Sequence, residues 1–232
     1  MDWKRFLFWN LVFLGIFGLI IGTEFAYRDP LFDLTGKAVP PMQEKDSATQ
    51  HLMEWVAILG ESKGIIATAV IGVSILPYSK GIFYITVLAI MSYFNAILKI
   101  LYHDPRPFYV QEEVQPLSCN KSYGNPSGHT MYFTCVFPLL FYLLFHSKVK
   151  GYYALSFNDY RHHIDYIIAY IIILLIFIFI GTVAVFGRVY LGVHALNQVL
   201  YGALLGFALF LYIFFIAYLP LQNYIYRFTE RR

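Results

Sequence analysis

The sequence predicts an all-α, polytopic membrane protein with about six transmembrane helices in a compact bundle. Only 13% of its 232 residues are charged and 59% are hydrophobic, whereas a soluble domain carries about a quarter charged residues. Apolar segments are spread along the whole chain, and the polar residues between them gather in short clusters. Without a repeat, low-complexity tract or linker, residues 1–232 are expected to form a single domain.

Six apolar segments set the expected helices. A hydrocarbon core of ~30 Å requires about 20 helical residues, and the fifth and sixth segments meet that length outright. The second and fourth segments are shorter and are expected to extend through the flanking residues 55–60 and 126–129. The segments are residues 6–23, 64–78, 81–101, 130–145, 166–186 and 196–219.

The first segment is expected to be a retained transmembrane helix with signal-anchor character. Lys4 and Arg5 precede it, as basic residues precede a signal peptide. However, its apolar stretch is longer than the ~7–15 residues of a signal-peptide core, and no clear small-residue cleavage site follows. Residues 38–50 are expected to form a surface loop or a short interfacial segment.

The distribution of Lys and Arg predicts the orientation of the bundle. If six helices alternate across the membrane, one side collects a series of basic residues, and we assign that side to the cytoplasm. We expect an endomembrane to hold the chain. The basic residues are Lys4, Arg5, Lys80, Lys148, Lys150, Arg161, Arg227, Arg231 and Arg232.

Charge and cysteine content exclude some functions. A net charge of +3 without a basic stripe argues against nucleic acid as a partner. Cys119 falls in a polar loop and Cys135 in an expected helix, so they form no metal-ligand spacing, and we expect two unpaired thiols. A glycosylation sequon begins at Asn120 on the predicted outer face, but such tripeptides are common by chance.

The first polar cluster, residues 99–107, places two cations at the end of the third segment. Pro105 and Pro107 disfavour a regular helix around Arg106. We therefore expect Lys99 to reach up from the helix end and Arg106 to reach back from a stiff turn. Arg offers a planar fork for two phosphate oxygens and Lys a mobile charge. Cations snorkelling at a membrane edge would give the same pattern.

The second polar cluster, Pro126-Ser127-Gly128-His129, opens the fourth segment. Free N–H groups at a helix N-terminus favour an anion, and small residues let the backbone approach it closely. Proline is compatible with the first turn of a helix. His129 would point toward the same anion, although an ordinary helix start with an incidental histidine also fits these residues.

The third polar cluster joins the fifth and sixth segments and contains Arg188 and His194. Gln198 follows His194 by four residues and would share its face of a helix beginning near Gly192. Gln198 is then placed to accept a hydrogen bond from Nδ1–H of His194 and to expose Nε2 as a nucleophile. A neutral amide stabilises an imidazolium poorly; in the serine-protease template, exchanging the orienting Asp for Asn costs roughly 10⁴-fold. Gln198 therefore marks either an accepted variant or lost activity.

Alternation of six helices places all three clusters on the same, non-cytoplasmic face. Together they supply three cations, two histidines and a helix start, an inventory that fits cleavage of a phosphate ester at a membrane surface. Ionisable residues at a membrane edge are functional candidates by default. The clusters offer no group of carboxylates, and their cations would repel a metal ion, so neither a metal nor another cofactor is expected.

These clusters resemble the three signatures of the type-2 phosphatidic acid phosphatase superfamily. That superfamily also contains lipid phosphate phosphatases, glucose-6-phosphatases and vanadium haloperoxidases. The resemblance covers roughly residues 60–219 and implies a six-helix core and a metal-independent phosphatase. The matching motifs are Lys99-x6-Arg106-Pro107, Pro126-Ser127-Gly128-His129 and Arg188-x5-His194.

The resemblance also implies roles for the residues. His194 would be the nucleophile that forms a phosphohistidine, and His129 the general acid for the leaving alcohol. Activity should peak within a limited pH band, since His129 must be protonated while His194 is neutral. The phosphoryl oxygens would be held by Lys99, Arg106 and Arg188, with backbone groups of Ser127 and Gly128.

This chain departs from the family pattern at two positions. Gly187 stands where the family usually has Ser, which removes one possible phosphate donor, and Gln198 stands where it usually has Asp. Glucose-6-phosphatases resemble the chain in having Gln there, but they have nine membrane helices. With about six expected helices, the chain is more similar to a lipid phosphate phosphatase. The expected substrate is therefore a lipid phosphate such as phosphatidic acid, and membrane lipids are expected to surround the protein. A catalytically impaired lipid-phosphate-binding relative, a glucose-6-phosphatase-like activity and a phosphotransferase stay open as alternatives.

Overall fold

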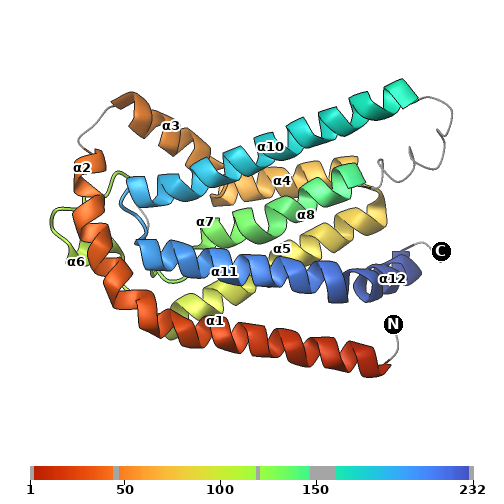
Figure 1. Ribbon diagram of the computed structural model, residues 1–232, viewed down its shortest axis with the longest axis horizontal. Coiled ribbons are helices and arrows are strands. Elements are labelled where there is room, and N and C mark those ends of the chain that lie inside the picture. The colour runs from red at the N-terminus through yellow and green to blue at the C-terminus, as the bar shows by residue number, and fades with distance from the viewer. Residues whose placement is uncertain (1–2, 44–46, 119–120, 147–159, 230–232) are drawn as a thin grey trace.

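The computed structural model describes residues 3–43, 47–118, 121–146 and 160–229, which form a bundle of long helices lying side by side (Figure 1). Within those ranges every regular element is helical, so the predicted all-α class is confirmed. The elements are α1 (Trp3–Ala38), α2 (Pro40–Gln43), α3 (Ser47–Ile58), α4 (Ser62–Ile75), α5 (Tyr78–Tyr102), α6 (Pro107–Val110), α7 (Gly128–Met131), η1 (Tyr132–Val136), α8 (Phe137–Phe141), η2 (Tyr142–His146), α10 (Tyr160–Tyr190), α11 (Leu196–Tyr212), η3 (Ile213–Ala217) and α12 (Tyr218–Thr229).

Among the described residues, five helices are long and apolar enough to cross a membrane, and a bent pair brings the number to six. This confirms the expectation of about six transmembrane helices. The continuous spans are Trp3–Gln43, Tyr78–Val110, Gly128–Phe145, Ile167–Tyr190 and Leu196–Phe228, and the bent pair is Ala48–Ile58 with Ser62–Ile75.

The second segment differs from its expected form. The expected extension through residues 55–60 is present, but with a bend, because α3 and α4 meet at an angle of 48°. The turn between them is very tight: a Cβ atom at Gly64 would lie 2.2 Å from the carbonyl oxygen of Ile58. Glycine at that position therefore allows α4 to fold back against the end of α3.

The first helix is also longer than expected. α1 continues through residues 24–38, which we expected to lie outside the membrane-spanning segment, and the chain is helical again from Ser47. Figure 1 shows α1 changing direction along its length. Pro30 lies inside the helix, where it removes one backbone hydrogen bond and favours such a bend. Residues 40–43 and 47–50, which we expected to form a surface loop or a short interfacial segment, are helical in α2 and α3.

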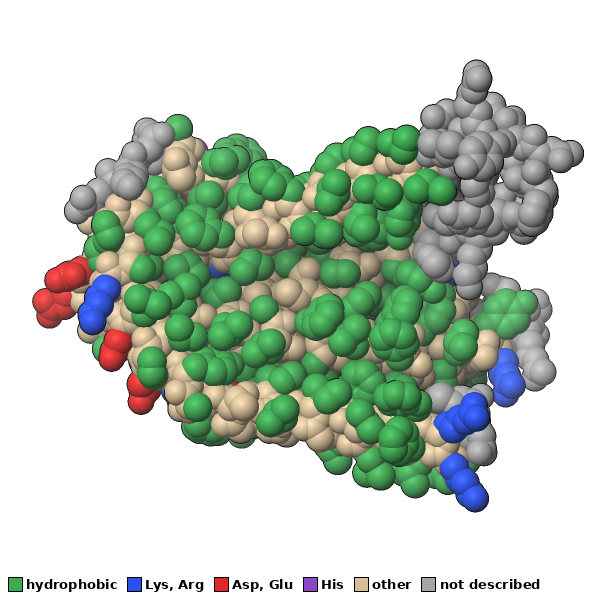
Figure 2. Space-filling model, viewed as in Figure 1, with side chains coloured by type: hydrophobic (Ala, Val, Ile, Leu, Met, Phe, Trp, Pro, Cys, Tyr) green, Lys and Arg blue, Asp and Glu red, His purple; other side chains and the backbone are tan. Residues whose placement is uncertain are grey.

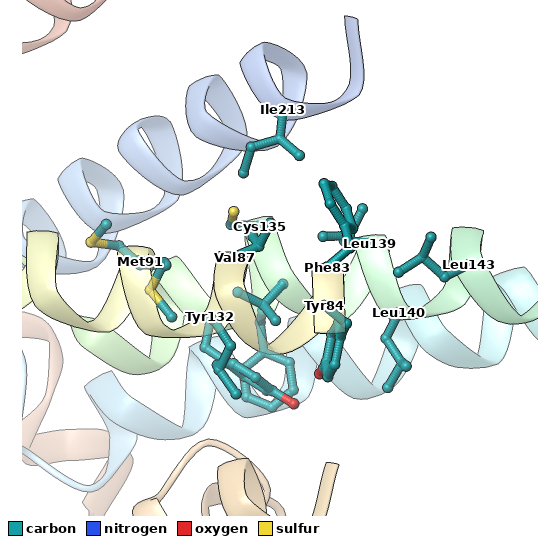
Figure 3. Packing of buried hydrophobic residues seen from close by; sticks show 14 of the residues in the cluster. Phe83, Tyr84, Val87, Met91, Tyr132, Cys135, Leu139, Leu140, Leu143 and Ile213 are labelled. Atoms are coloured by element: carbon teal, nitrogen blue, oxygen red, sulfur yellow. The ribbon is translucent and has the colours of Figure 1, made fainter. Parts of the chain in front are cut away.

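The main core lies between α5 and the helix that runs from α7 through η2 (Figure 3). Phe83, Tyr84 and Val87 of α5 pack there against Tyr132 and Leu139. All five side chains are at most 2% exposed. Because lipid surrounds such a bundle, close packing rather than exclusion from water holds these helices together.

Two glycines bring α11 against α7 and so help to place the second polar cluster. A Cβ atom at Gly202 would lie 2.7 Å from the carbonyl oxygen of Ser127. At Gly206 it would lie 2.1 Å from Oγ1 of Thr134. Any larger residue at these positions would push the helices apart. Small residues at membrane helix interfaces allow this close approach of the backbones.

Side-chain type varies along the bundle (Figure 2). On the face shown, hydrophobic side chains cover the middle, Asp and Glu gather at the end near α2 and α6, and Lys and Arg lie mostly at the opposite end. Both chain termini lie at that second end (Figure 1).

Cys135 is free and buried. The interpretations placed on Cys119, Asn120, Lys148, Lys150, Arg231, Arg232 and the side chain of Arg161 lie outside the described residues.

Candidate active site

The three polar clusters meet at one end of the bundle, around His194. This residue lies in the turn between α10 and α11 and is 1% exposed. Burial lowers the pKa of His194 well below the ordinary histidine range, and the nearby Arg106, Lys99 and Arg188, followed by His129, lower it further. The convergence expected from the helix count is therefore present in the fold.

Arg106 is held on three sides. α5 ends at Tyr102, and His103 adopts a left-handed conformation that turns the chain out of the helix. Arg106 Nε donates to the Ser122 carbonyl oxygen at 2.7 Å and Nη2 to Ser122 Oγ at 3.0 Å. Nη1 donates to the Val193 carbonyl oxygen at 2.5 Å. The guanidinium thus ties the first cluster to the third, and part of the fork that we assigned to phosphate binds the protein itself.

Lys99 reaches the site from the last turn of α5, as expected. Its Nζ donates to the carbonyl oxygen of Tyr123 at 2.5 Å. An ammonium carries three donors, so this anchor leaves protons of Lys99 that can contact an anion. Lys99 and Arg106 both lie within electrostatic range of Arg188.

The second cluster forms the start of α7. Ser127 is the N-cap: its Oγ accepts hydrogen bonds from the backbone N–H of Thr130 at 3.4 Å and from Thr130 Oγ1 at 3.0 Å. The backbone N–H of Ser127 donates to the Gln198 carbonyl oxygen at 3.0 Å. We expected this N–H to bind phosphate, but the protein itself uses it. The N–H groups of Gly128 and His129, in the first turn of α7, have no intrahelical partner.

His129 lines a cavity, and one of its ring nitrogens is buried without a partner in the part of the chain that the structure describes. It hydrogen-bonds the backbone of Ala57 in α3, whereas Nε2 has no hydrogen-bond partner among the described residues. A Cβ atom at Gly60 would lie 2.5 Å from the imidazole Cδ2, so glycine at that position lets the ring occupy its place. The cavity has a volume of about 550 Å³ and is lined by Gly60, Glu61, Ser62, Lys63, Ile65, Met91, Ser92, Asn95, Lys121, Gly128 and His129.

Arg188 lies in the last turn of α10 and is 1% exposed. Its Nε and Nη1 have no hydrogen-bond partner in the described parts of the chain. Buried guanidinium donors are costly unless they bind an acceptor, so these groups suit phosphoryl oxygens. Arg188 is the cation of the site whose donors the protein itself uses least.

The departure at Gly187 also affects the packing of α10 against α3. A Cβ atom at this position would lie 3.3 Å from Sδ and 3.5 Å from Cβ of Met53 in α3. A serine side chain would therefore start against α3. Glycine here lets α3 approach α10.

Gln198 fixes the tautomer of His194. Gln198 Nε2 donates to the Pro105 carbonyl oxygen at 2.8 Å, and Oε1 accepts from the Ala195 N–H at 3.2 Å. These backbone partners settle which end of the amide is the oxygen. Because Oε1 lies 3.3 Å from His194 Nδ1, that nitrogen carries the hydrogen. The lone pair is then on Nε2, which lies 3.4 Å from Nη1 of Arg106.

Sequence reasoning found the Gln198–His194 pair but missed the wider role of Gln198. α11 begins at Leu196 rather than near Gly192, which has a left-handed backbone with φ of 70°. His194 therefore precedes the helix, and Gln198 connects Pro105, His194 and Ser127 through its side chain and carbonyl. Ser122, the partner of Arg106, was also missed because no motif or helical spacing relates the two residues.

The polytopic α-helical bundle defines an integral membrane protein, with two histidines and three cations gathered at one end. The chain belongs to the PAP2 superfamily, whose family model matches residues 80–220. A curated relative, phosphatidylglycerophosphatase B of Bacillus subtilis (strain 168), is 33% identical over 164 residues, which are 69% of this chain and 71% of the relative. The chain is accordingly a membrane phosphatase that hydrolyses phosphate esters.

A solved structure has the same fold. It is described as the first transmembrane PAP2-type phosphatidylglycerolphosphate phosphatase from Bacillus subtilis. The TM-score is 0.65 at 20% sequence identity, and the match covers 95% of this chain and 98% of that one. At this identity, the likeness establishes the fold.

Proposed function

We propose that the protein hydrolyses lipid phosphomonoesters through a phosphohistidine on His194, without a metal ion. The observation that carries the proposal is the tautomer set by Gln198, which places the Nε2 lone pair beside Arg106. Lys99 and Arg188 add two further positive charges near His194, where a phosphoryl group would bind. Preorganised donors of this kind stabilise the charge that develops on the phosphoryl oxygens.

In the first step, Nε2 of His194 attacks phosphorus while the bond from phosphorus to the ester oxygen breaks. His129 donates a proton to the leaving oxygen. In the second step, water attacks the phosphohistidine, its proton passes to His129, and the nitrogen–phosphorus bond breaks to release inorganic phosphate. Support for His129 in this role comes from its position in the cavity wall, from its hydrogen bond to the backbone of Ala57 in α3, and from Nε2, which no protein group uses among the described residues.

The proposed substrate is a lipid phosphate whose leaving group occupies the cavity beside His129. Apolar Ile65 and Met91 line that cavity together with the charged Glu61, Lys63 and Lys121. A lipid headgroup attached to an apolar chain fits such a mixed lining. Phosphatidic acid is the substrate expected from the sequence, and the name of the B. subtilis relative adds phosphatidylglycerophosphate as the first candidate to test.

We place the site on the lumenal or extracellular face. Support comes from two basic residues at the ends of helices remote from the site. Lys80 lies in the first turn of α5, and Arg227 lies in the last turn of α12. The surface in Figure 2 shows the same separation of acidic and basic ends. A cysteine-accessibility experiment with an impermeant maleimide tests this orientation. Residence in an endomembrane stays a prediction, tested by fractionation of the source cell.

The primary test is phosphate release by detergent-purified protein in the presence of EDTA. The substrates are phosphatidylglycerophosphate, phosphatidic acid, a sphingoid-base phosphate and glucose 6-phosphate, with His194→Ala run in parallel. Lipid-selective release that disappears in His194→Ala, together with a ³²P-phosphohistidine trapped at low temperature, is expected. Loss of wild-type activity in EDTA that Mg²⁺ restores would overturn the metal-independent mechanism.

The same assay separates the alternative functions. Lipid phosphate that binds without release would identify a non-catalytic relative. Preference for glucose 6-phosphate would identify a glucose-6-phosphatase-like activity, and phosphate transfer to an added alcohol would identify a phosphotransferase. The His194 tautomer favours turnover over simple binding, because it leaves Nε2 unprotonated, as attack on phosphorus requires.

A further inference from the structure

Glu24 and Arg28 of α1 form a partly buried ion pair that the site description above does not use. Glu24 is 0% exposed. Arg28 Nε donates to its Oε1 and Oε2 at 2.9 and 3.1 Å, and Nη2 donates to Oε2 at 2.6 Å. Both residues precede residues 80–220, the part matched by the family model. A carboxylate placed fully inside a membrane bundle requires strong partners.

The partners on the other side belong to the site loops. Asn125 Nδ2 donates to Glu24 Oε1 at 2.8 Å and to Asp104 Oδ2 at 2.8 Å. Arg28 Nη1 lies 3.4 Å from Asp104 Oδ1. In addition, the backbone N–H of Gly124 donates to the Asp104 carbonyl oxygen at 2.9 Å. Together these bonds form one network, which we define as Glu24, Arg28, Asp104 and Asn125.

The network stands immediately before two functional motifs. Asp104 is two residues before Arg106, and Asn125 is two residues before Ser127. One amide group, that of Asn125, therefore joins the turn that carries Arg106 to the turn that starts α7. The carboxylate of Glu24 fixes the position of that amide from α1.

Arg28 is itself held in place by two aromatic rings. Its guanidinium carbon lies 4.8 Å from the centroid of the Phe25 ring and 5.0 Å from that of Tyr102. The hydroxyl of Tyr102 is 2.8 Å from that of Tyr201 in α11. The faces of both rings attract the guanidinium electrostatically. α1, α5 and α11 are therefore linked through Arg28, Tyr102 and Tyr201.

We infer that Glu24 and Arg28 are positioning residues for catalysis, which set the spacing between Arg106 and the start of α7. This inference rests on the proposed function of those two groups. Catalysis of phosphoryl transfer depends mainly on the placement of donors around the transition state. A change in spacing should therefore lower kcat more than it raises KM, since the lipid contacts outside the phosphoryl group are untouched.

The test compares Glu24→Gln with Asp33→Asn, which removes an exposed carboxylate from the same helix. Glu24→Gln keeps the shape of the side chain but removes the charge that holds Arg28. For folded, monodisperse enzyme, we expect kcat to fall about 10- to 100-fold with KM changed less than about threefold. The inhibition constant of vanadate, which mimics the transition state, should rise in parallel. Asp33→Asn should match wild type in all three quantities.

A second variant keeps the inference testable if Glu24→Gln does not fold. Arg28→Lys retains the charge at a side chain that is 24% exposed, but it loses the bidentate fork. The same fall in kcat and rise in the vanadate constant are expected. Unchanged kcat and vanadate inhibition per folded molecule, with only a lower melting temperature, would show a purely structural pair and overturn the inference. Phosphate release by His194→Ala at the wild-type rate would instead overturn the proposed function.

Discussion

His194 Nδ1 and Gln198 Oε1 lie 3.3 Å apart, and the amide is oriented by backbone groups on both sides. A carboxylate at this position has no N–H with which to bond the Pro105 carbonyl. The glutamine therefore performs two tasks: it orients the histidine and it ties the turn before Arg106 to α11. This double role accounts physically for an amide where the family usually has an aspartate.

Gln198→Ala is expected to lower kcat about 10- to 100-fold, because it removes the acceptor that holds His194 and leaves two buried backbone groups unpaired. KM should change little, since Gln198 is fully buried and does not line the cavity. Steady-state kinetics on folded, monodisperse protein measures kcat and KM. Full activity in Gln198→Ala would show that His194 is oriented without the amide.

Gly124→Ala should act through the same contact. A Cβ atom at residue 124 would lie 2.3 Å from Gln198 Nε2, so the amide must move away from Pro105. We expect a loss of kcat similar to that of Gln198→Ala and little additional loss in the double variant. Gly15→Ala is the matched control, because nothing lies within 4 Å of its Cβ position. Losses of kcat that add in the double variant would show that Gly124 and Gln198 act independently.

His129→Ala tests the proposed general acid through the leaving group. A lipid alkoxide needs a proton as it leaves, so kcat for the lipid phosphate should fall about 10²- to 10⁴-fold. An aryl phosphate with a nitrophenolate leaving group needs no such proton, and its hydrolysis should fall much less. Equal losses for both substrates would contradict the assignment and point to a role of His129 in phosphate binding.

The pH dependence should reveal the charges around His194. Burial and the surrounding Arg106, Lys99 and Arg188 hold the pKa of His194 below its ordinary range, so the nucleophile is neutral at pH 7 and stays neutral on mild acidification. The acid limb of kcat/KM due to His194 should therefore lie below pH ~6.5. Lys99→Met removes one of these cations and should move that limb to higher pH. Ionisation of the substrate is common to both proteins and cancels in the comparison, and an unmoved limb would contradict the assignment.

Gly187→Ser restores the residue that is usual in the family. Its side chain would meet Met53, a flexible neighbour, at 3.3 Å. We expect kcat to change by less than about threefold, under ~0.7 kcal/mol, because the new hydroxyl starts against α3. Kinetics with the lipid substrate checks this value. A large gain in activity would show that the hydroxyl reaches the phosphoryl group.

The sequence was sufficient to predict the bundle and the polar clusters that meet at one end of it. Hydropathy predicts the long spans because each must present about 20 apolar residues to lipid. Lys99, His129 and His194 were predicted from their positions at span ends, and alternation of the helices predicts that they meet. These inferences use local composition and one simple rule of topology.

Tertiary structure decided the contacts that set the chemistry. The bend between α3 and α4, the helical continuation of α1 to Ala38 and the use of the Ser127 N–H by Gln198 depend on close approaches between distant segments. Glu24 reads in the sequence as one acidic residue after an apolar stretch, yet it is buried beside Asn125. Local spacing determines which side chains share a helix face, whereas hydrogen bonds across the bundle arise only when the helices are packed, so the fold alone assigns those partners.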